Sequence, residues 1–370
     1  MLTAIVSDLH LGTTSGADLV RRPGVRARLM EAIAGADRVV VLGDMLELRE
    51  QPVAAVLTAA APFLDALGEA TAGKQLVIVP GNHDHELVGP ALDRARIAGD
   101  PLALDSTFPP SEGVLIRSVA AHLPRTEIVL AYPGIRLRED VYATHGHYLD
   151  MHLTVPRMEC VIASAIGRFA GGGNGSGAPL SYEAALAPMY AFAYSLVQQG
   201  EAKAVTRGGS LSRTIWERSR PGDGRRLARF ALGRVAIPGG VWAINRLGLG
   251  PFRAEISGLE LRRAGLRAMA TVIDTLGIEA DHVIFGHTHR TGPLPGDDEG
   301  WTLPGGTRLT NTGSWLYEPA FIRRQGPANP YWPGGVTLLE DEGPPRLTNV
   351  LGDVDLAGET SAAKRTNVPH

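Results

Sequence analysis

Short apolar runs recur along the chain, and each one ends at glycine, proline or a polar residue. Runs of four to six residues rich in Val, Ile and Leu occupy 2–7, 38–42, 76–79 and 282–285. Runs of this length with such boundaries predict buried strands. The segments 25–34 and 52–72 have helical spacing, with Pro52 in a first turn and Gly73 as a stop. The alternation of strands and helices predicts an α/β architecture.

The stretch from 151 to 280 breaks this alternation. It contains a glycine-rich loop at 171–177, and between 202 and 268 it has 14 Lys and Arg against 4 Asp and Glu. We interpret 151–280 as a mostly helical, basic insert or cap on a core formed by the two flanking parts. The core is predicted at 1–150 and 281–353, with closing strands at 308–312, 336–340 and 346–351. The small, polar tail at 354–370 is predicted to be disordered.

Composition narrows the class of protein. Apolar residues make up 44% of the 370 residues, which rules out global disorder. The single cysteine, Cys160, rules out a disulfide scaffold or a multi-cysteine zinc cluster, and we expect it to be buried and inert. The chain opens directly on an apolar strand pattern without the features of a signal peptide. We therefore expect a cytoplasmic protein.

The basic stretch at 202–268 leaves three interpretations open. It could be a solvated, Arg-rich surface, or it could attract an anionic substrate. The segments 225–234 and 242–253 mix basic with apolar residues, a mixture that also suits the binding of acyl chains or an anionic membrane surface, with a peripheral location. No nucleic-acid-binding motif is present, so no nucleic-acid partner is expected. Oligomeric state is left open.

Residue types that bind metals follow almost every predicted strand. They are Asp8 and His10, then Asp44, then Asn82 and His83, then His145, then His287 and His289. Any one of them alone could be a strand-end cap or a turn residue. In open α/β sheets, however, ligands gather beyond the carboxyl ends of the strands. Five such clusters in this order favour a site for two divalent ions, since imidazole and carboxylate groups suit Mn, Fe or Zn.

The order of these blocks resembles the calcineurin-like metallophosphoesterase superfamily over about 1–150 and 280–320. The matching blocks are Asp8-x-His10, Gly43-Asp44, Gly81-Asn82-His83-Asp84, His145-Gly146 and Gly286-His287-Thr288-His289. The resemblance implies a four-layer αββα sandwich, in which two sheets pack face to face with helices outside. It also implies that two divalent metal ions are the cofactors.

The resemblance implies a role for each residue. One ion would be held by Asp8, His10 and His289. The other would be held by Asn82, His145 and His287. Asp44 would bridge the two ions. Asn82 and His83 would contact the phosphate, and His83, oriented by Asp84, could also protonate the leaving group.

Six further histidines have no place in these blocks. His147 competes with His145 for one ligand position; we favour His145, because it follows the strand predicted at 141–144, and expect His147 to support a ligand or face the substrate. The remaining five are interpreted as ordinary core or surface residues: His85, His122, His152, His282 and His370.

One branch of the superfamily is closer than others. The segments 43–48, 144–146 and 311–315 are similar to the UDP-diacylglucosamine diphosphatases, which split a pyrophosphate bond in a lipid-linked sugar nucleotide, typically with manganese. Two positions depart from that branch: His83 stands where it usually has Arg, and His147 where it usually has Asp. Protein Ser/Thr phosphatases fit less well, because Glu47-Leu48-Arg49 occupies the place of their Asp-Arg-Gly.

The sequence therefore predicts a phosphoesterase that depends on two metal ions, with manganese favoured over iron or zinc. A metal-bound water or hydroxide would attack phosphorus in line. The bond predicted is a phosphodiester or pyrophosphate rather than a phosphomonoester, and the large cap suggests a bulky, nucleotide-linked or lipid-linked substrate. Two alternatives are a nuclease that uses the arginines of the cap, and a non-catalytic metal-binding scaffold on the same fold.

Overall fold

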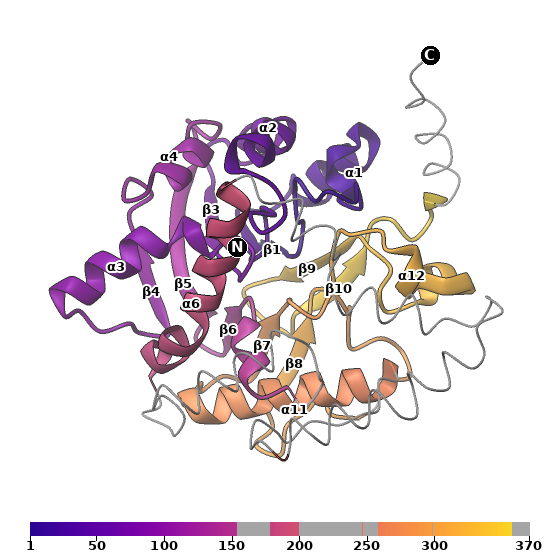
Figure 1. Ribbon diagram of the computed structural model, residues 1–370. Helices are drawn as coiled ribbons and strands as arrows, with labels where there is room; N and C mark the ends of the chain where they lie inside the picture. Colours follow the sequence, from indigo (N-terminus) through magenta and orange to yellow (C-terminus); the bar gives the residue numbers. More distant parts are fainter. Residues whose placement is uncertain (154–177, 200–245, 247–257, 298, 357–370) are drawn as a thin grey trace.

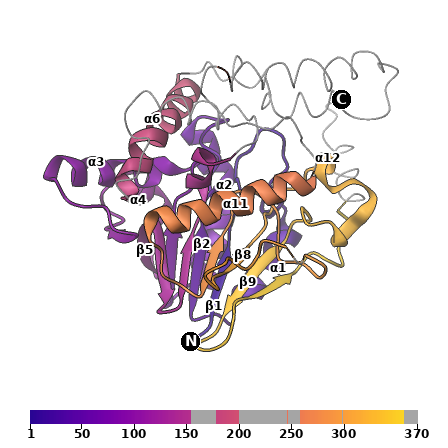
Figure 2. The ribbon, with the colours of Figure 1, turned by 90° about the horizontal axis from the view of Figure 1, so that it is seen from below.

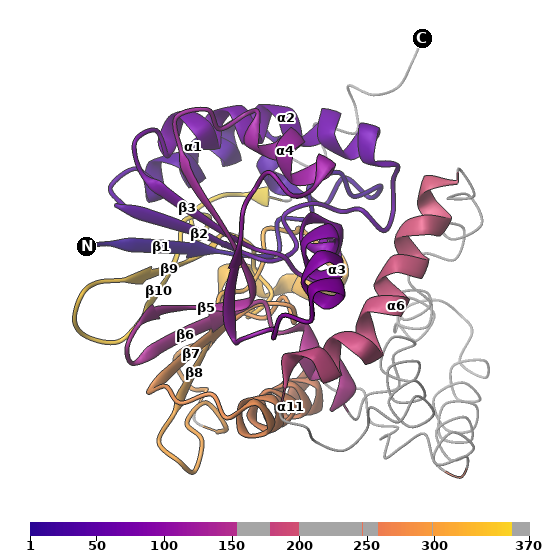
Figure 3. The ribbon, with the colours of Figure 1, turned by 90° about the vertical axis from the view of Figure 1, so that its left-hand side faces the viewer.

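Ten strands form one sheet that folds over on itself into two layers (Figure 1, Figure 3). The computed structural model describes residues 1–153, 178–199, 246, 258–297 and 299–356. The strand order is β10-β9-β1-β2-β3-β5-β6-β7-β8, and β4 pairs with β5. The strands are β1 (Thr3–Val6), β2 (Arg38–Leu42), β3 (Gln75–Val79), β4 (Asp105–Phe108), β5 (Glu127–Arg138), β6 (Val141–Thr144), β7 (His282–Phe285), β8 (Arg308–Asn311), β9 (Gly335–Leu339) and β10 (Arg346–Asn349).

The long strand β5 connects the two layers. Its first residues pair with β3 in parallel, whereas Gly134 and the residues after it pair with β6 in antiparallel. At its far end, the Arg138 guanidinium donates to the Glu340 carbonyl at 2.8 Å, beyond the end of β9 and beside the start of β1. Within β5 the chain thus reverses direction and runs back toward the edge at which β1, β2 and β3 begin. For this reason β6, β7 and β8 end at the same edge as β1, β2 and β3.

The two sheet layers and the helices outside them form four layers. Between the sheets, Val40 and Val77 of the first layer share one apolar cluster with Ala143 and Ile284 of the second. Helices α1 (Pro23–Ile33) and α2 (Val53–Ala70) cover the outer face of the first layer. Helix α11 (Gly258–Leu276) lies across the second layer (Figure 2). The predicted αββα sandwich is confirmed.

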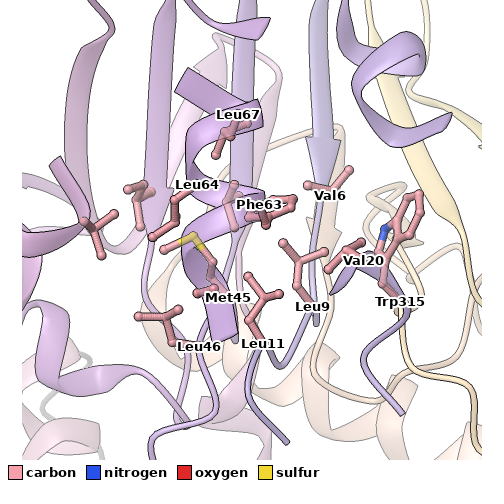
Figure 4. Close-up of a cluster of buried hydrophobic side chains, with 14 of the residues drawn as sticks. Val6, Leu9, Leu11, Val20, Met45, Leu46, Phe63, Leu64, Leu67 and Trp315 are labelled. Carbon is pink, nitrogen blue, oxygen red and sulfur yellow. The ribbon is translucent and has the colours of Figure 1, made fainter. Parts of the chain in front are cut away.

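Helix α2 shows why these sequences fold as they do. Pro52 caps the helix instead of entering its first turn, and the helix ends three residues before Gly73, which has a φ of +73°. Its buried residues recur every three or four positions, so one face packs on the sheet. Figure 4 shows Phe63 among Val6, Leu9 and Leu64. By length and composition α2 could cross a membrane; in this fold one of its faces packs into the apolar cluster that includes Val56, Phe63 and Leu67.

The predicted cap is described only in part. Helix α6 (Pro179–Gln198) runs beside the strand ends, and α11 packs its Met269 and Val272 against β7 as an outer layer of the sandwich. Cys160, the loop 171–177, the segment 225–234 and residues 357–370 lie outside the described residues, as do all residues of 242–253 except Arg246. The other helices among the described residues are α3 (Gly89–Ala98), α4 (Val114–Ala120) and α12 (Pro319–Ile322). Short 3₁₀ segments lie at Leu19–Arg21, His85–Leu87, His147–Met151 and Arg323–Ala328.

Candidate metal centre

The predicted metal ligands come together at the shared edge of the two layers. Each follows a strand: β1, β2, β3, β6 or β7. Ligand atoms lie within 4.8 Å of one another in three groups: Asp8, His10 and His289; His10, Asp44 and His83; Asp44, His145 and His287. Asn82 joins the third group, because its Oδ1 lies 3.1 Å from His287 Nδ1. The structure thus brings together all seven residues that the sequence predicts as ligands.

Asp44 lies between residues of the two predicted ligand sets. Its Oδ2 is 3.5 Å from His10 Nε2, which belongs to the first predicted set. The same oxygen is 3.2 Å from His145 Nε2, which belongs to the second. Its Oδ1 accepts a hydrogen bond from the backbone N–H of His83 at 2.9 Å. Asp44 therefore has the position that a bridging carboxylate requires.

The backbone at this centre is strained. Among the described residues, five that are not glycine have a positive φ: Asp8, His10, Asp44, His287 and His289. Their φ values run from 45° to 64°. Such conformations cost of order 1–3 kcal/mol each and collect at functional sites. All five are predicted ligands, so the strain turns each side chain toward the centre.

Two glycines let the strand-end loops approach each other closely. A Cβ at Gly43, where φ is +86°, would lie 2.1 Å from His145 Nδ1. A Cβ at Gly81 would lie 2.2 Å from Asp44 Oδ1. Neither position can accept a side chain without moving a predicted ligand.

The lone pairs that face the centre fit divalent cations. His145 donates from Nδ1 to the Leu42 carbonyl at 2.9 Å, so its buried Nε2 points inward, 3.2 Å from Asp44 Oδ2 without an aligned hydrogen bond. Asp8 Oδ1 is likewise buried, 3.3 Å from His289 Nε2 without an aligned hydrogen bond. Unsatisfied buried polar atoms are costly, and inward nitrogen and oxygen ligands suit Mn, Fe or Zn. The residues therefore fit the two ions that the fold implies.

Surplus negative charge supports the same conclusion. Burial by itself lowers the pKa of His145, but the Asp44 and Asp8 carboxylates raise it to about 10. Burial also lowers the pKa of His10, but Glu47 and Asp44 outweigh burial and raise this pKa to about 9. The carboxylates thus favour positive charge at the centre. A divalent ion bound there would supply that charge.

Glu47, to which the sequence assigned no role, holds two histidines. Its Oε2 accepts from His10 Nδ1 at 2.9 Å, and its Oε1 accepts from His83 Nδ1 at 2.8 Å. The sequence predicts Asp84 as the orienting residue, and here the structure differs. The Asp84 carboxylate accepts backbone N–H groups of Gly81 and Met45, both at 2.7 Å. Asp84 therefore fastens the loop after β2 to the loop after β3.

Asp150 is a second residue that the sequence interpretation missed. His287 Nε2 lies 2.9 Å from Asp150 Oδ1, and its Nδ1 lies 3.1 Å from Asn82 Oδ1. Donation from Nε2 to Asp150 would leave the Nδ1 lone pair free for an ion at the centre. Metal-binding histidines typically have their other ring nitrogen held by a carboxylate in this way. The only signal for Asp150 is its place shortly after His145.

Behind the centre, a buried polar network connects α6 to the core. The Glu183 carboxylate accepts from the Tyr132 and Tyr148 hydroxyls, both at 2.6 Å, and from His85 Nε2 at 2.9 Å. Tyr132 Oη also lies 2.9 Å from His147 Nε2. His147 is only 1% exposed and outside the ligand groups, and burial holds its pKa well below the usual range. His145, not His147, thus lies among the predicted ligands.

Two pockets border the centre. The first, which we call the α6 pocket, is lined by residues that include Arg49, Asn82, His83, His85, Glu86 and Tyr190. The second, the α11 pocket, is open to solvent and meets the centre at His287 and Thr288. Its other lining residues include Leu153, Gly265, Leu266, Phe285, Arg290 and Trp301.

Comparison with known proteins gives a family match to the first part of the chain. Residues 1–164 match the model of the calcineurin-like phosphoesterase family. Residues 1–164 are thus similar to the calcineurin-like phosphoesterase domain, a domain type that acts on phosphoric esters and uses divalent metal ions. The match ends before β7, so His287 and His289 lie outside the matched residues. The fold brings them to the predicted ligands of the matched part. The narrower resemblance to UDP-diacylglucosamine diphosphatases stays a prediction.

Solved structures add little to this identification. Similar chains include the cold-active protein-tyrosine phosphatase of a psychrophile, Shewanella sp., at 15% identity and a TM-score of 0.31. A mutant described as a cold-active protein tyrosine phosphatase is similar at 14% identity and a TM-score of 0.32. Each comparison covers 95% of this chain and 78% of the other, and neither carries an argument at these scores. None of the curated proteins compared with the chain matches it.

Proposed function

We propose that this protein is a phosphoesterase that uses two divalent metal ions to hydrolyse a phosphodiester or pyrophosphate bond. The observation that carries the proposal is the position of Asp44, whose Oδ2 lies 3.5 Å from His10 Nε2 and 3.2 Å from His145 Nε2. One carboxylate oxygen is thus shared between two sets of nitrogen and oxygen ligands. Hydrolysis consumes one water: its oxygen bonds to phosphorus, one P–O bond breaks, and the leaving oxygen takes a proton.

Each side chain would have a defined task. Asp8, His10 and His289 would hold one ion, and Asn82, His145 and His287 the other, with Asp44 shared. When bound, such ions neutralise charge on phosphoryl oxygens and lower the pKa of a bound water. The strained backbone and the outer contacts of Glu47 and Asp150 fix the inward nitrogens before substrate arrives.

His83 is the proposed proton donor to the leaving group. Its ring is 25% exposed on the wall of the α6 pocket, and Glu47 engages its Nδ1. Nε2 is the nitrogen left to donate to the leaving oxygen, and solvent would return the proton afterwards. The leaving group would accordingly depart through the α6 pocket.

Two pockets at one centre favour a substrate with two substituents. A phosphodiester or pyrophosphate has a group on each side of the phosphorus that reacts, whereas a monoester has only one. Manganese is the ion we would load first, since the ligand set suits it as well as iron or zinc. A nucleotide-linked or lipid-linked pyrophosphate remains within this proposal.

The test is hydrolysis of bis(4-nitrophenyl) phosphate beside 4-nitrophenyl phosphate, after chelator treatment and reloading with Mn²⁺. We expect Mn²⁺-dependent turnover, with the diester preferred. His83→Ala should reduce diester turnover, whereas His122→Ala, a half-buried histidine that contacts Asp65, should not. Turnover of the monoester alone would contradict the bond class. No turnover with two ions bound would favour the non-catalytic scaffold.

A further inference from the structure

We propose that the α11 pocket binds the substituent that stays on phosphorus, and that this substituent is a bulky apolar or aromatic group. The inference rests on the proposed function, which places the phosphoryl group at the metal centre. It assigns a substrate class: esters with an aryl or similarly large apolar group opposite the leaving group.

The position of the pocket supports this assignment. His287 faces the centre through Nδ1, 3.1 Å from Asn82 Oδ1, and the same residue lines the α11 pocket together with Thr288. A substituent on a phosphorus held at the centre can therefore enter the pocket directly. His83 lines the other pocket, so the leaving group and the remaining substituent would occupy separate spaces.

The lining of the α11 pocket suits an apolar, flat group. Leu153, Leu266 and Phe285 are each at most 7% exposed and form apolar lining. Beside them, the Arg290 guanidinium lies over the Trp301 ring, 5.5 Å from its centroid. An aromatic group in the pocket would add to these apolar and ring contacts.

The two arginines that line the pocket are paired with a neighbouring carboxylate, Asp297. Both oxygens of Asp297 accept from Arg290 at 2.8 Å, and Oδ1 also accepts from Arg262 at 2.6 Å. One carboxylate is thus shared by two guanidinium groups, which leaves a positive balance and disfavours a cationic substituent. A neutral aryl group, or one that carries a single negative charge, fits this balance.

Gly265 provides the second observation. It lies inside α11, buried and lining the pocket, where glycine weakens a helix relative to alanine. A Cβ there would meet only Thr288 Cγ2, at 3.7 Å, which is ordinary contact. Its φ is not positive either, so neither sterics nor backbone conformation requires glycine. A larger side chain at 265 would instead project into the pocket.

The experiment compares phenyl 4-nitrophenyl phosphate with methyl 4-nitrophenyl phosphate in the Mn²⁺-loaded protein. The leaving group is the same, and each kcat/KM is divided by the uncatalysed rate. We expect the phenyl ester to be preferred about tenfold or more, since burying a ring removes substantial apolar area from water. Gly265→Leu should bring the ratio close to one. Thr271→Leu, at an exposed position of the same helix, should leave the ratio as in the wild type.

Binding provides a readout that does not need turnover. In titration calorimetry with metal-stripped protein, diphenyl phosphate should bind more tightly than dimethyl phosphate, and Gly265→Leu should remove the difference. A thermal melt verifies that this variant is folded. Equal preference for the two esters, or a preference that survives in folded Gly265→Leu, would overturn the pocket assignment while leaving metal-dependent turnover intact. If no ester is hydrolysed, the proposed function fails, and calorimetry alone decides the pocket.

Discussion

The two pockets beside the metal centre are built in opposite ways. The α6 pocket has polar walls, and behind it the buried Glu183 carboxylate accepts three hydrogen bonds. The α11 pocket has apolar lining and a helical glycine with room for a side chain. This difference suggests that the two pockets have different roles. The α6 pocket would position charged and proton-donating groups, and the α11 pocket would accommodate a substituent of the substrate. Substitutions should accordingly damage chemistry on the first side and change selectivity on the second.

The largest loss of activity is expected from substitution of Asp44, which lies at the centre between the two pockets. Asp44→Asn removes the charge shared by both ligand sets, and we expect kcat/KM to fall by about a thousandfold or more, because metal ions contribute several kcal/mol to such reactions. Phenyl and methyl esters should lose activity equally. Asp65→Asn, at an exposed carboxylate that contacts His122, is the control. Retention of activity within tenfold would show that no ion bridge depends on Asp44.

On the polar side, His83→Ala should lower kcat/KM by about a hundredfold when the leaving group is a poor one, as expected for loss of a general acid. Diphenyl phosphate releases phenol, which needs a proton more than 4-nitrophenol does. The loss should therefore be larger for diphenyl phosphate than for bis(4-nitrophenyl) phosphate. Equal losses for both esters would mean that His83 contacts the phosphate without donating a proton.

Glu183→Gln tests the buried network behind the α6 pocket. We expect a loss of about 2–3 kcal/mol of unfolding free energy at pH 7, since charged hydrogen bonds to buried groups are broken. Burial raises the pKa of Glu183, but His85 and the tyrosine hydroxyls outweigh it and lower the pKa below 4.5.

That pKa direction sets the pH dependence of the loss. A carboxyl with a depressed pKa stabilises the fold fully above pH 4.5, and the contribution disappears as pH falls through the folded pKa. The gap between wild type and Glu183→Gln should therefore be widest at neutral pH and shrink below pH 4.5. Urea unfolding measures it, and a gap that stays constant from pH 7 to pH 4 would contradict this account.

Asp150→Asn tests the contact that orients His287. Because the carboxylate fixes which ring nitrogen faces the centre, we expect Mn²⁺ affinity to fall by about tenfold. Calorimetric titration of Mn²⁺ into metal-stripped protein measures the change. Asp274→Asn, at an exposed position of α11, serves for comparison. An unchanged Mn²⁺ affinity would show that Asp150 does not orient His287 for metal binding.

The smallest effect belongs to the apolar side. Gly265→Ala should raise the free energy of unfolding by about 0.5–1 kcal/mol, because alanine favours the helix and its Cβ fits. Gly277→Ala should do the opposite, since Gly277 ends α11 with a φ of +62°. Denaturant midpoints measure both. Destabilisation by Gly265→Ala would mean that the pocket has less room there than the structure shows.

Local patterns sufficed for much of the fold. Strands at 38–42 and 282–285 were predictable because runs of Val and Ile end abruptly at glycine. The ligand blocks were predictable because parallel strands place their ends at one edge. The reversal of β5 was not predictable in this way, since it depends on pairing with β3 and then β6.

The supporting residues of the centre were harder to foresee. Glu47 reaches back to His10 and His83, and Asp150 reaches across to His287, so both act through side-chain directions that spacing does not specify. The sequence predicted that Asp84 orients His83, but the Asp84 carboxylate accepts hydrogen bonds from the backbone N–H groups of Gly81 and Met45. Glu183 lies on α6, far along the chain from its partners Tyr132 and His85.

The central claim, two ions that act together across Asp44, is tested most directly by one titration. Metal-stripped protein is titrated with Mn²⁺, and bound ions per chain and hydrolysis of bis(4-nitrophenyl) phosphate are measured at each point. We predict that turnover rises with occupancy of the second site and reaches its maximum at two ions per chain. Full turnover with one ion or none, or no turnover at two, would contradict the account.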